Sequence, residues 1–177
     1  MEPDDTELIR RTLVEHDLCA FDQLVLRHQS PVRSLLRRLT CGNEALADDL
    51  SQEAFLIVWR KLASFRNEAR FSPWIHQIAY RTFLAHARSR RDHEPLDENF
   101  NSGSVESTAR GSDFQHDLEI AMLKLSESER AVVTLCLGSS LTHDEAAKVL
   151  QLPLGTVKTH LLRGREKLRT LLLEWKS

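Results

Sequence analysis

The chain has 177 residues, of which 41% are hydrophobic and 28% are charged; this allows one ordinary core or two small ones, but not an enzyme with a separate cofactor domain. Its net charge of −2 is not that of a uniformly basic nucleic-acid-binding protein. Since no apolar run is long enough to cross a membrane and the acidic start MEPDDTELIRR lacks the pattern of a secretory signal, we expect a cytoplasmic protein without membrane insertion.

Signals for helix starts recur along the chain, whereas no stretch alternates apolar and polar residues among β-branched types. We therefore predict an all-α fold. In the first half, Asp17 can cap a helix over residues 18–28. Ser30-Pro31 and Ser72-Pro73 each read as an N-cap followed by proline at the first helical position. Further helices are predicted over residues 44–64 and 73–91.

The helix predicted over residues 44–64 has two different faces. One half is apolar and predicts core contacts through Leu46, Leu50, Ala54, Phe55, Ile57, Val58 and Leu62. The opposite half carries Asp48, Asp49, Gln52, Glu53 and Arg60, and among these polar groups lie Leu56 and Trp59. Exposed apolar groups ringed by charge are typical of a protein-binding surface. The alternative is that Trp59 folds down onto its own domain.

Residues 64–91 combine aromatic and cationic side chains. Such mixtures hold single-stranded DNA, with rings against the bases and cations along the phosphates. The members are Phe65, Arg66, Arg70, Phe71, Trp74, Tyr80, Arg81, Phe83 and Arg88. The alternative is that most of the aromatic residues, Trp74 and Phe83 above all, belong to the core.

The charge of the chain changes sharply after this helix. Residues 81–91 carry four arginines and no acid, whereas residues 92–117 carry Arg110 and the acids Asp92, Glu94, Asp97, Glu98, Glu106, Asp113 and Asp117. From about residue 93 to 112 the sequence is also rich in Asn, Ser and Gly and has no hydrophobic periodicity. We predict an acidic flexible linker over 93–113, between small helical domains at 1–92 and 114–177.

Two capping boxes mark helix starts in the C-terminal domain. Ser126 with Glu129 precedes RAVVTLCL, and Thr142 with Glu145 precedes AAKVL. The first of these helices ends at Gly138-Ser139-Ser140, the second turns at Gln151-Leu152-Pro153, and a third helix follows over about residues 154–173. This spacing predicts a helix-turn-helix, a module that reads duplex DNA.

The third helix also has two faces. A core stripe is predicted through Val157, Leu161, Gly164, Leu168 and Leu172. The remaining surface offers hydroxyls and cations suited to phosphates and guanine edges, and consists of Thr156, Lys158, Thr159, Leu162, Arg163, Glu166 and Arg169. The alternative is an ordinary solvated charged face. The capped helix and tight turn ahead of it favour contact with DNA.

The C-terminal stretch LSESERAVVTLCLGSSLTHDEAAKVLQLPLGTVKTHLLRGREKLRTLL resembles the fourth conserved region of bacterial sigma factors of the extracytoplasmic-function group. In that group, GTVK followed by a basic helix is a diagnostic string. The N-terminal half resembles the second conserved region through AFDQLV, DDLSQEAFLIVWRKL, SFRNEARFSPWIHQIA and RSRR. GTVK alone is less decisive, because response-regulator output domains have a related helix-turn-helix.

The resemblance implies a sigma factor that binds core RNA polymerase, recognises the minus-35 promoter element with its last helices and melts the minus-10 element. It implies contact with the clamp helices of the largest polymerase subunit through Asp48, Asp49, Gln52, Glu53, Leu56 and Trp59. It implies minus-10 contacts through Phe65, Arg66, Asn67, Arg70, Phe71, Tyr80, Arg81 and Arg88, with a flipped base in the loop 64–72. An anti-sigma factor is a further implied partner.

The chain departs from the family pattern in one helix. Where the family usually has Ala-Arg-Asn and an Asp four residues after the Asn, this chain has Ala79-Tyr80-Arg81 and then Ala85. The family's minus-10 sequence preference is therefore not carried over to this chain.

Two other classes of protein are less consistent with the sequence. A one-component or response-type regulator with the same DNA domain needs a ligand pocket, or a phospho-acceptor Asp on alternating strands and helices. An enzyme would have to use His76, His86 and nearby acids, but the eight histidines show neither metal-ligand spacing nor a nucleophile partner. Cys19, Cys41 and Cys136 are widely spaced and predict neither a disulfide framework nor a zinc site. We expect no catalytic residue, metal or cofactor.

Overall fold

The computed structural model describes residues 3–66, 69–93 and 113–174. Every regular element in these ranges is helical, as predicted. The N-terminal half contains α1 (Asp5–Val14), α2 (Leu18–Leu39), α3 (Glu44–Lys61), the 3₁₀ turn η1 (Leu62–Ser64) and α4 (Phe71–His93). The C-terminal half contains α5 (Asp113–Leu123), α6 (Glu127–Val133), the π-helical turn η2 (Thr134–Gly138), α7 (His143–Leu150) and α8 (Leu154–Glu174). None of these helices is both long and apolar enough to span a bilayer.

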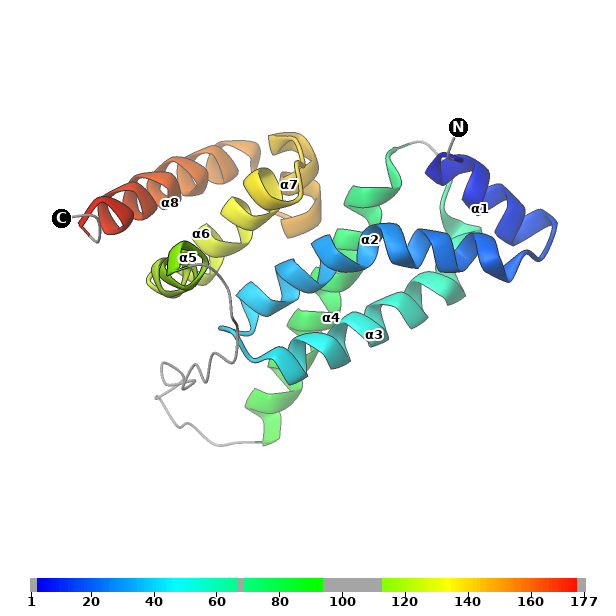
Figure 1. The fold of residues 1–177 in the computed structure, drawn as a ribbon, viewed down its shortest axis with the longest axis horizontal. Helices are drawn as coiled ribbons and strands as arrows, with labels where there is room; N and C mark the ends of the chain where they lie inside the picture. Colours follow the sequence, from blue (N-terminus) through cyan, green and yellow to red (C-terminus); the bar gives the residue numbers. More distant parts are fainter. Residues whose placement is uncertain (1–2, 67–68, 94–112, 175–177) are drawn as a thin grey trace.

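In the N-terminal half, α2 and α3 lie side by side and α4 crosses them, while α1 packs against α2 (Figure 1). The apolar faces of these helices meet in a core that includes Leu24, Leu36, Leu50, Val58 and Ile75. The C-terminal half lies at the other end of the molecule, with α8 along its outer edge (Figure 1). The predicted helix over residues 44–64 is confirmed as α3 followed by η1.

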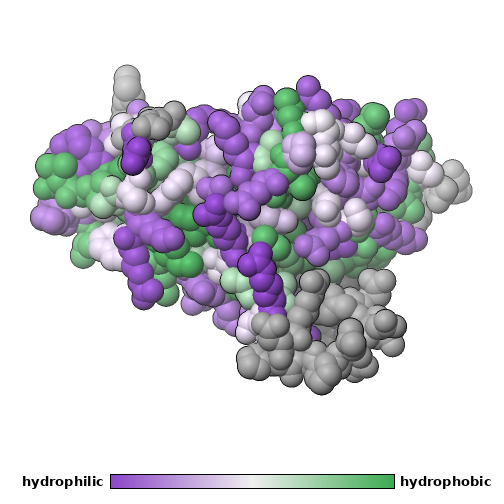
Figure 2. Space-filling model, turned by 180° about the vertical axis from the view of Figure 1, so that it is seen from behind, coloured by the Kyte–Doolittle hydropathy of each residue, from purple (hydrophilic) through white to green (hydrophobic). Residues whose placement is uncertain are grey.

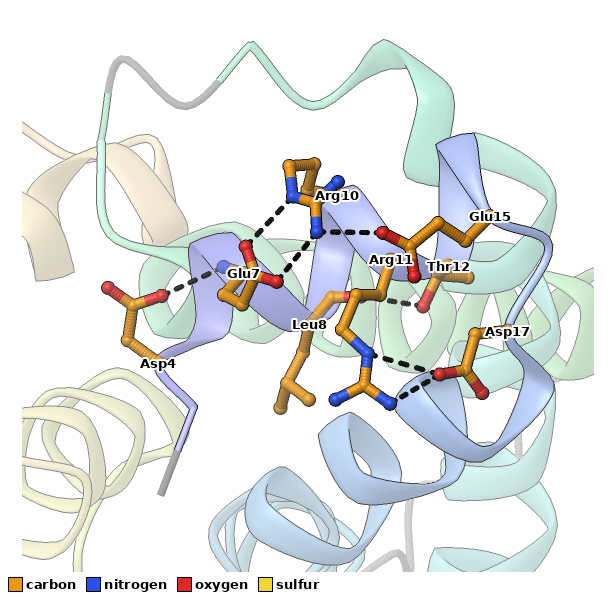
Figure 3. Close-up of polar contacts among 8 residues, drawn as sticks. All are labelled: Asp4, Glu7, Leu8, Arg10, Arg11, Thr12, Glu15 and Asp17. Carbon is orange, nitrogen blue, oxygen red and sulfur yellow. Dashed lines mark hydrogen bonds and ion pairs between the residues drawn. The ribbon is translucent and has the colours of Figure 1, made fainter. Parts of the chain in front are cut away.

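Polar contacts fix α1, a helix that the sequence analysis did not predict (Figure 3). Asp4 caps its start, because its Oδ1 accepts a hydrogen bond from the amide of Glu7 at 2.8 Å. Near its end, Arg11 forms an ion pair with Asp17. Since Asp17 also caps α2, this pair joins the two helices across their turn, next to the buried Leu8.

The helix start predicted at Ser30-Pro31 is wrong, because α2 runs unbroken from Leu18 to Leu39 with Pro31 inside it. A proline inside a helix costs about 3 kcal/mol. The buried residues on both sides of Pro31 nevertheless share one stripe, formed by Ala20, Leu24, His28, Val32, Leu35, Leu36 and Leu39. Burying that continuous stripe outweighs the lost backbone hydrogen bond. The predicted cap at Asp17 is confirmed, since its Oδ1 accepts from the Ala20 amide at 3.2 Å.

The start of α4 also differs from the prediction. The helix begins at Phe71, so Ser72 and Pro73 lie inside its first turn, where a proline is tolerated because its amide would have no helical partner. The predicted linker falls on residues 94–112, outside the described residues, apart from its ends at His93 and Asp113.

The two halves pack on each other along two seams. In one seam α4 lies against α7, and in the other α2 lies against α6 and η2. Neither seam was predicted from the sequence. The two helical regions predicted on either side of the linker are therefore joined by side-chain contacts as well as by the chain between them.

Candidate nucleic-acid interface

Two capping boxes were predicted to start helices of the helix-turn-helix domain, and the structure confirms both, at the starts of α6 and α7. Ser126 accepts from the Glu129 amide at 3.3 Å while the Glu129 carboxylate accepts from the Ser126 amide at 3.0 Å. Thr142 and Glu145 exchange the same two bonds at 3.3 and 2.8 Å. At the end of α7, Gln151 adopts the left-handed conformation with φ of 56°. This residue reverses the chain so that α8 starts across α7.

The predicted core stripe of α8 faces α6. Val157, Leu161 and Leu168 are buried, and Leu172 is half-buried. Gly164 lies so close to α6 that a Cβ atom built on it would be 2.7 Å from Cγ2 of Val133. This contact explains the glycine in mid-helix, since any larger side chain would push the two helices apart.

The opposite face of α8 is open to solvent. Six of the seven predicted residues are exposed and Thr156 is half-buried; the exposed members are Lys158, Thr159, Leu162, Arg163, Glu166 and Arg169. Lys158, Arg163 and Arg169 form no ion pair with another described residue, so their charges are available to phosphates. Arg165 was not among the predicted residues, but it is exposed between Leu162 and Arg169, and the same helical spacing indicates it.

A second exposed face lies on α3. Leu56 is 57% exposed and Trp59 is 44% exposed. The indole ring of Trp59 packs edge-on against Phe21, with ring centroids 4.7 Å apart. Trp59 therefore contacts its own domain, as the alternative interpretation held, and still presents nearly half of its surface to solvent. Its role in binding another protein stays a prediction. Around the pair, Asp49, Gln52 and Glu53 are exposed, and Asp48 accepts from Arg33 at 2.8 Å.

Apolar surface is also present where α1 meets α2. Val14 is 68% exposed and Leu18 is 64% exposed, with Leu13 beside them at 37%. Figure 2 shows apolar surface at this end of the molecule, amid hydrophilic surface. These residues were not predicted as a surface from the sequence, because helix α1 was not predicted.

The aromatic residues of the 64–91 segment divide between core and surface. Phe71 is only 3% exposed, and its ring lies 5.5 Å from those of Phe65 and Trp74. Phe71 is therefore a core residue in this structure, contrary to its prediction as a DNA contact. Phe83 is also buried, as the alternative interpretation held, whereas Phe65, Trp74 and Tyr80 are half-buried. Burial raises the pKa of the Tyr80 phenol.

The cations of this segment remain at the surface. Arg66, Arg70, Arg81 and Arg88 are all exposed, while Asn67 lies outside the described residues. Arg70 forms a two-point ion pair with Glu145 of α7, with nitrogen–oxygen distances of 2.9 and 2.7 Å. The basic surface of the N-terminal half thus touches the helix-turn-helix directly. No sequence signal indicated this contact.

His76 and His86, the histidines that an enzyme would have to use, both lie at least partly inside the helical packing. His76 is fully buried, and its Nδ1 lies 2.7 Å from the carbonyl oxygen of Ser72. Burial lowers the pKa of His76 below its ordinary value of 6.5, while His86 is half-buried. Within the described ranges, no cluster of His, Cys, Asp or Glu has the arrangement of a metal site.

Comparison with known proteins gives matches on both halves. Residues 24–93 match the family model for Sigma-70 region 2, and residues 116–168 match that for Sigma-70 region 4. The ECF RNA polymerase sigma factor SigE of Mycolicibacterium smegmatis is 32% identical, over 99% of this chain and 70% of its own length. The ECF RNA polymerase sigma-E factor of Escherichia coli is 31% identical, over 90% of this chain and 92% of its own length.

A solved structure has the same arrangement of helices. The sigma factor RpoE from Bartonella quintana, crystallised with the anti-sigma factor NepR, superimposes with a TM-score of 0.72. The sequences are 25% identical, and the match covers 86% of this chain and 96% of that chain.

Proposed function

Because this chain belongs to the extracytoplasmic-function (ECF) sigma factors of RNA polymerase, we propose that its parts divide the work of that family. It is a sigma factor, which binds core RNA polymerase and promoter DNA and directs promoter-specific initiation of transcription. Residues 1–92 would bind core polymerase and open the minus-10 element, and residues 114–177 would recognise the minus-35 element. Residues 93–113 would link them. The two family matches, which fall on either side of this linker, support the division.

The minus-35 contact is assigned to the outward face of α8. The observation that carries this assignment is that α8 buries one stripe and exposes on its other face cations that pair with no described residue, directly after a capped helix and a tight turn. Arginine and lysine in this position can reach guanine edges or phosphates in the major groove. The residues are Thr156, Lys158, Thr159, Leu162, Arg163, Glu166 and Arg169, with Arg165 added from its exposure.

The minus-10 contact is assigned to the loop before α4 and to the exposed side of that helix. Arg66, Arg70, Arg81 and Arg88 would hold the phosphates of the opened strand, and the half-buried rings of Phe65 and Tyr80 would stack on its bases. Asn67 keeps its place in this proposal through the family resemblance alone. Phe71 is left out because its ring is buried.

The polymerase contact is assigned to the exposed face of α3. Leu56 and Trp59 would provide the apolar centre, since a few residues near the centre of an interface, tryptophan prominent among them, carry most of the binding energy. Asp48, Asp49, Gln52 and Glu53 would form the polar rim, facing the clamp helices of the largest subunit. Acidic side chains at a rim mainly steer association and orient the partners.

The family also guides the remaining assignments. An anti-sigma factor is a proposed partner, since the similar Bartonella sigma factor was crystallised with one. The protein would act in the cytoplasm, where RNA polymerase works. We assign it no catalytic reaction of its own, because the relatives are transcription initiation factors.

Run-off transcription with purified core polymerase on a genomic promoter library tests the function. The full chain added to core enzyme should give discrete transcripts that core alone does not give. A helix-turn-helix regulator of the one-component or response type would bind DNA without conferring initiation on core enzyme. DNA binding without new transcripts would therefore contradict the sigma assignment.

A further inference from the structure

The ion pair between Arg70 and Glu145 joins the two DNA-binding parts of the molecule. Arg70 Nε donates to Glu145 Oε1 at 2.9 Å, and Nη2 donates to Oε2 at 2.7 Å. The two residues are 75 positions apart in sequence. Both nitrogens on one side of the guanidinium are thus occupied by one carboxylate, the same fork-to-fork geometry in which arginine binds a phosphate.

Glu145 is held in place for this contact by its own helix. Its Oε2 accepts from the amide of Thr142 at 2.8 Å and from the Thr142 hydroxyl at 3.0 Å. The hydrogen bond from Arg70, followed by the Thr142 amide and hydroxyl, lowers the pKa of Glu145 to about 2. The carboxylate is therefore charged and oriented throughout the physiological pH range.

Further contacts hold the two halves in this arrangement. On the same seam, Gln77 of α4 donates to the carbonyl oxygen of Lys148, at the far end of α7, at 3.2 Å. On the second seam, the buried Arg130 donates to the Arg38 carbonyl at 3.2 Å and lies 2.8 Å from Sγ of Cys41. Both partners belong to the end of α2 and its following turn. Contacts between α6 and the end of α2 thus hold the two halves together at a second place, in addition to the seam between α4 and α7.

We propose that Glu145 competes with DNA for Arg70, so that the packed chain is restrained from binding minus-10 DNA. The inference rests on the proposed place of Arg70 in the minus-10 surface. A guanidinium whose fork is filled by Glu145 cannot bind a phosphate in the same way, and α7, which carries Glu145, packs directly against α4. The restraint is selective, because Lys158 and Arg163 on α8 are exposed in the same structure.

A double-mutant cycle on the full chain tests the competition. Fluorescence anisotropy with a fluorescein-labelled single-stranded DNA of random sequence measures affinity without knowledge of the promoter, because the phosphate contact is independent of sequence. Glu145→Gln keeps the capping box, which accepts glutamine, but removes the charge. We expect this variant to bind the strand about two- to fivefold more tightly, the factor that one partly exposed ion pair supplies. In an Arg70→Gln background the same change should give no gain.

Asp144→Asn is the matched control, since Asp144 is exposed in the same first turn of α7 and has no ion pair with a described residue. It should leave affinity for the strand unchanged. A gain from Glu145→Gln that persists in the Arg70→Gln background, or that Asp144→Asn reproduces, would mean general charge repulsion and overturn the proposal. The absence of any gain would overturn it as well.

The same set of variants tests the proposed function separately. If Arg70 contacts DNA, then Arg70→Gln should weaken strand binding in the Glu145→Gln background, where the competitor is absent. If it does not, the assignment of Arg70 to the minus-10 surface fails, and the inference fails with it. If it does and the cycle still shows no coupling, only the competition is refuted.

Discussion

The polymerase-binding face proposed on α3 is tested most directly by Leu56→Asp. Leu56 is 57% exposed, so the free protein has little to lose from the change. Its helix propensity falls by about half a kcal/mol, and we expect the total cost to stability to remain near 1 kcal/mol. In a protein of this size that cost lowers the melting temperature by about 2–4 °C.

The effect on binding should be much larger. Full burial of a leucine contributes about 1.5–3 kcal/mol, so burying the exposed part of Leu56 contributes about 1–2 kcal/mol. An aspartate would also place an unpaired carboxylate in the interface beside Glu53, which adds about 2 kcal/mol. A combined loss of about 3–4 kcal/mol corresponds to binding that is about 100- to 1000-fold weaker.

Titration of labelled protein with core polymerase measures this loss, and a melting curve of the same sample measures stability. Leu26→Asp is the matched control, because Leu26 is 66% exposed on α2 and lies outside the proposed surface. Unchanged polymerase affinity in Leu56→Asp, or an equal loss in Leu26→Asp, would refute the reasoning. A large fall in melting temperature would show instead that Leu56 supports the core.

Three further outcomes are expected. Alanine at Lys158 or Arg163 should weaken minus-35 binding by about 1–3 kcal/mol if the side chain reads a base, or reduce the salt dependence by about one charge if it holds a phosphate; footprints identical to the parent would contradict the α8 assignment. The free energy of unfolding should fall as the pH drops below 6.5. In the unfolded chain His76 takes up a proton there, whereas in the folded protein burial lowers the pKa of His76 and the ring stays neutral. Urea midpoints at about pH 7.5 and about pH 5.5 measure this fall, which should be smaller in His76→Gln and would be equal in both proteins if His76 were irrelevant. Neutralising acids of the linker should weaken core binding most at low salt, since an acidic segment can occupy a basic channel by mimicking phosphates; equal affinity at low and high salt and an equal ratio of abortive to full-length RNA would make the linker a simple tether. The positions to change to Asn or Gln are Asp97, Glu98, Glu106 and Asp113.

Local signals in the sequence predicted the features that depend on neighbouring residues. The capping boxes at Ser126 and Thr142 formed as expected because each needs only residues three apart. The two faces of α3 and α8 followed from helical periodicity, which also identified Leu56 and Trp59 as exposed. Helical periodicity fixes which side of a helix is apolar, and the apolar side is buried in almost any packing.

Predictions were wrong where a local preference competed with burial. Pro31 indicated a helix start, but the apolar stripe that crosses it belongs to one continuous helix. Phe71 lies in a segment with the composition of a DNA-binding surface, but its ring is buried and packs against His28 of α2, with ring centroids 5.1 Å apart. In both cases the deciding free energy comes from apolar surface buried against distant helices, which local propensity does not contain.

By itself the sequence determined the helical fold class, the helix-turn-helix, the exposed faces of α3 and α8, and the family. Only the tertiary structure decided how the halves meet. Arg70 pairs with Glu145 and Arg130 reaches the Arg38 carbonyl across 75 and 92 positions of the chain. Neither arginine is distinguished from the other arginines of the chain by its neighbours in sequence. The partner of a long, flexible cation is set by which helices pack together, and that packing is the result of the whole core.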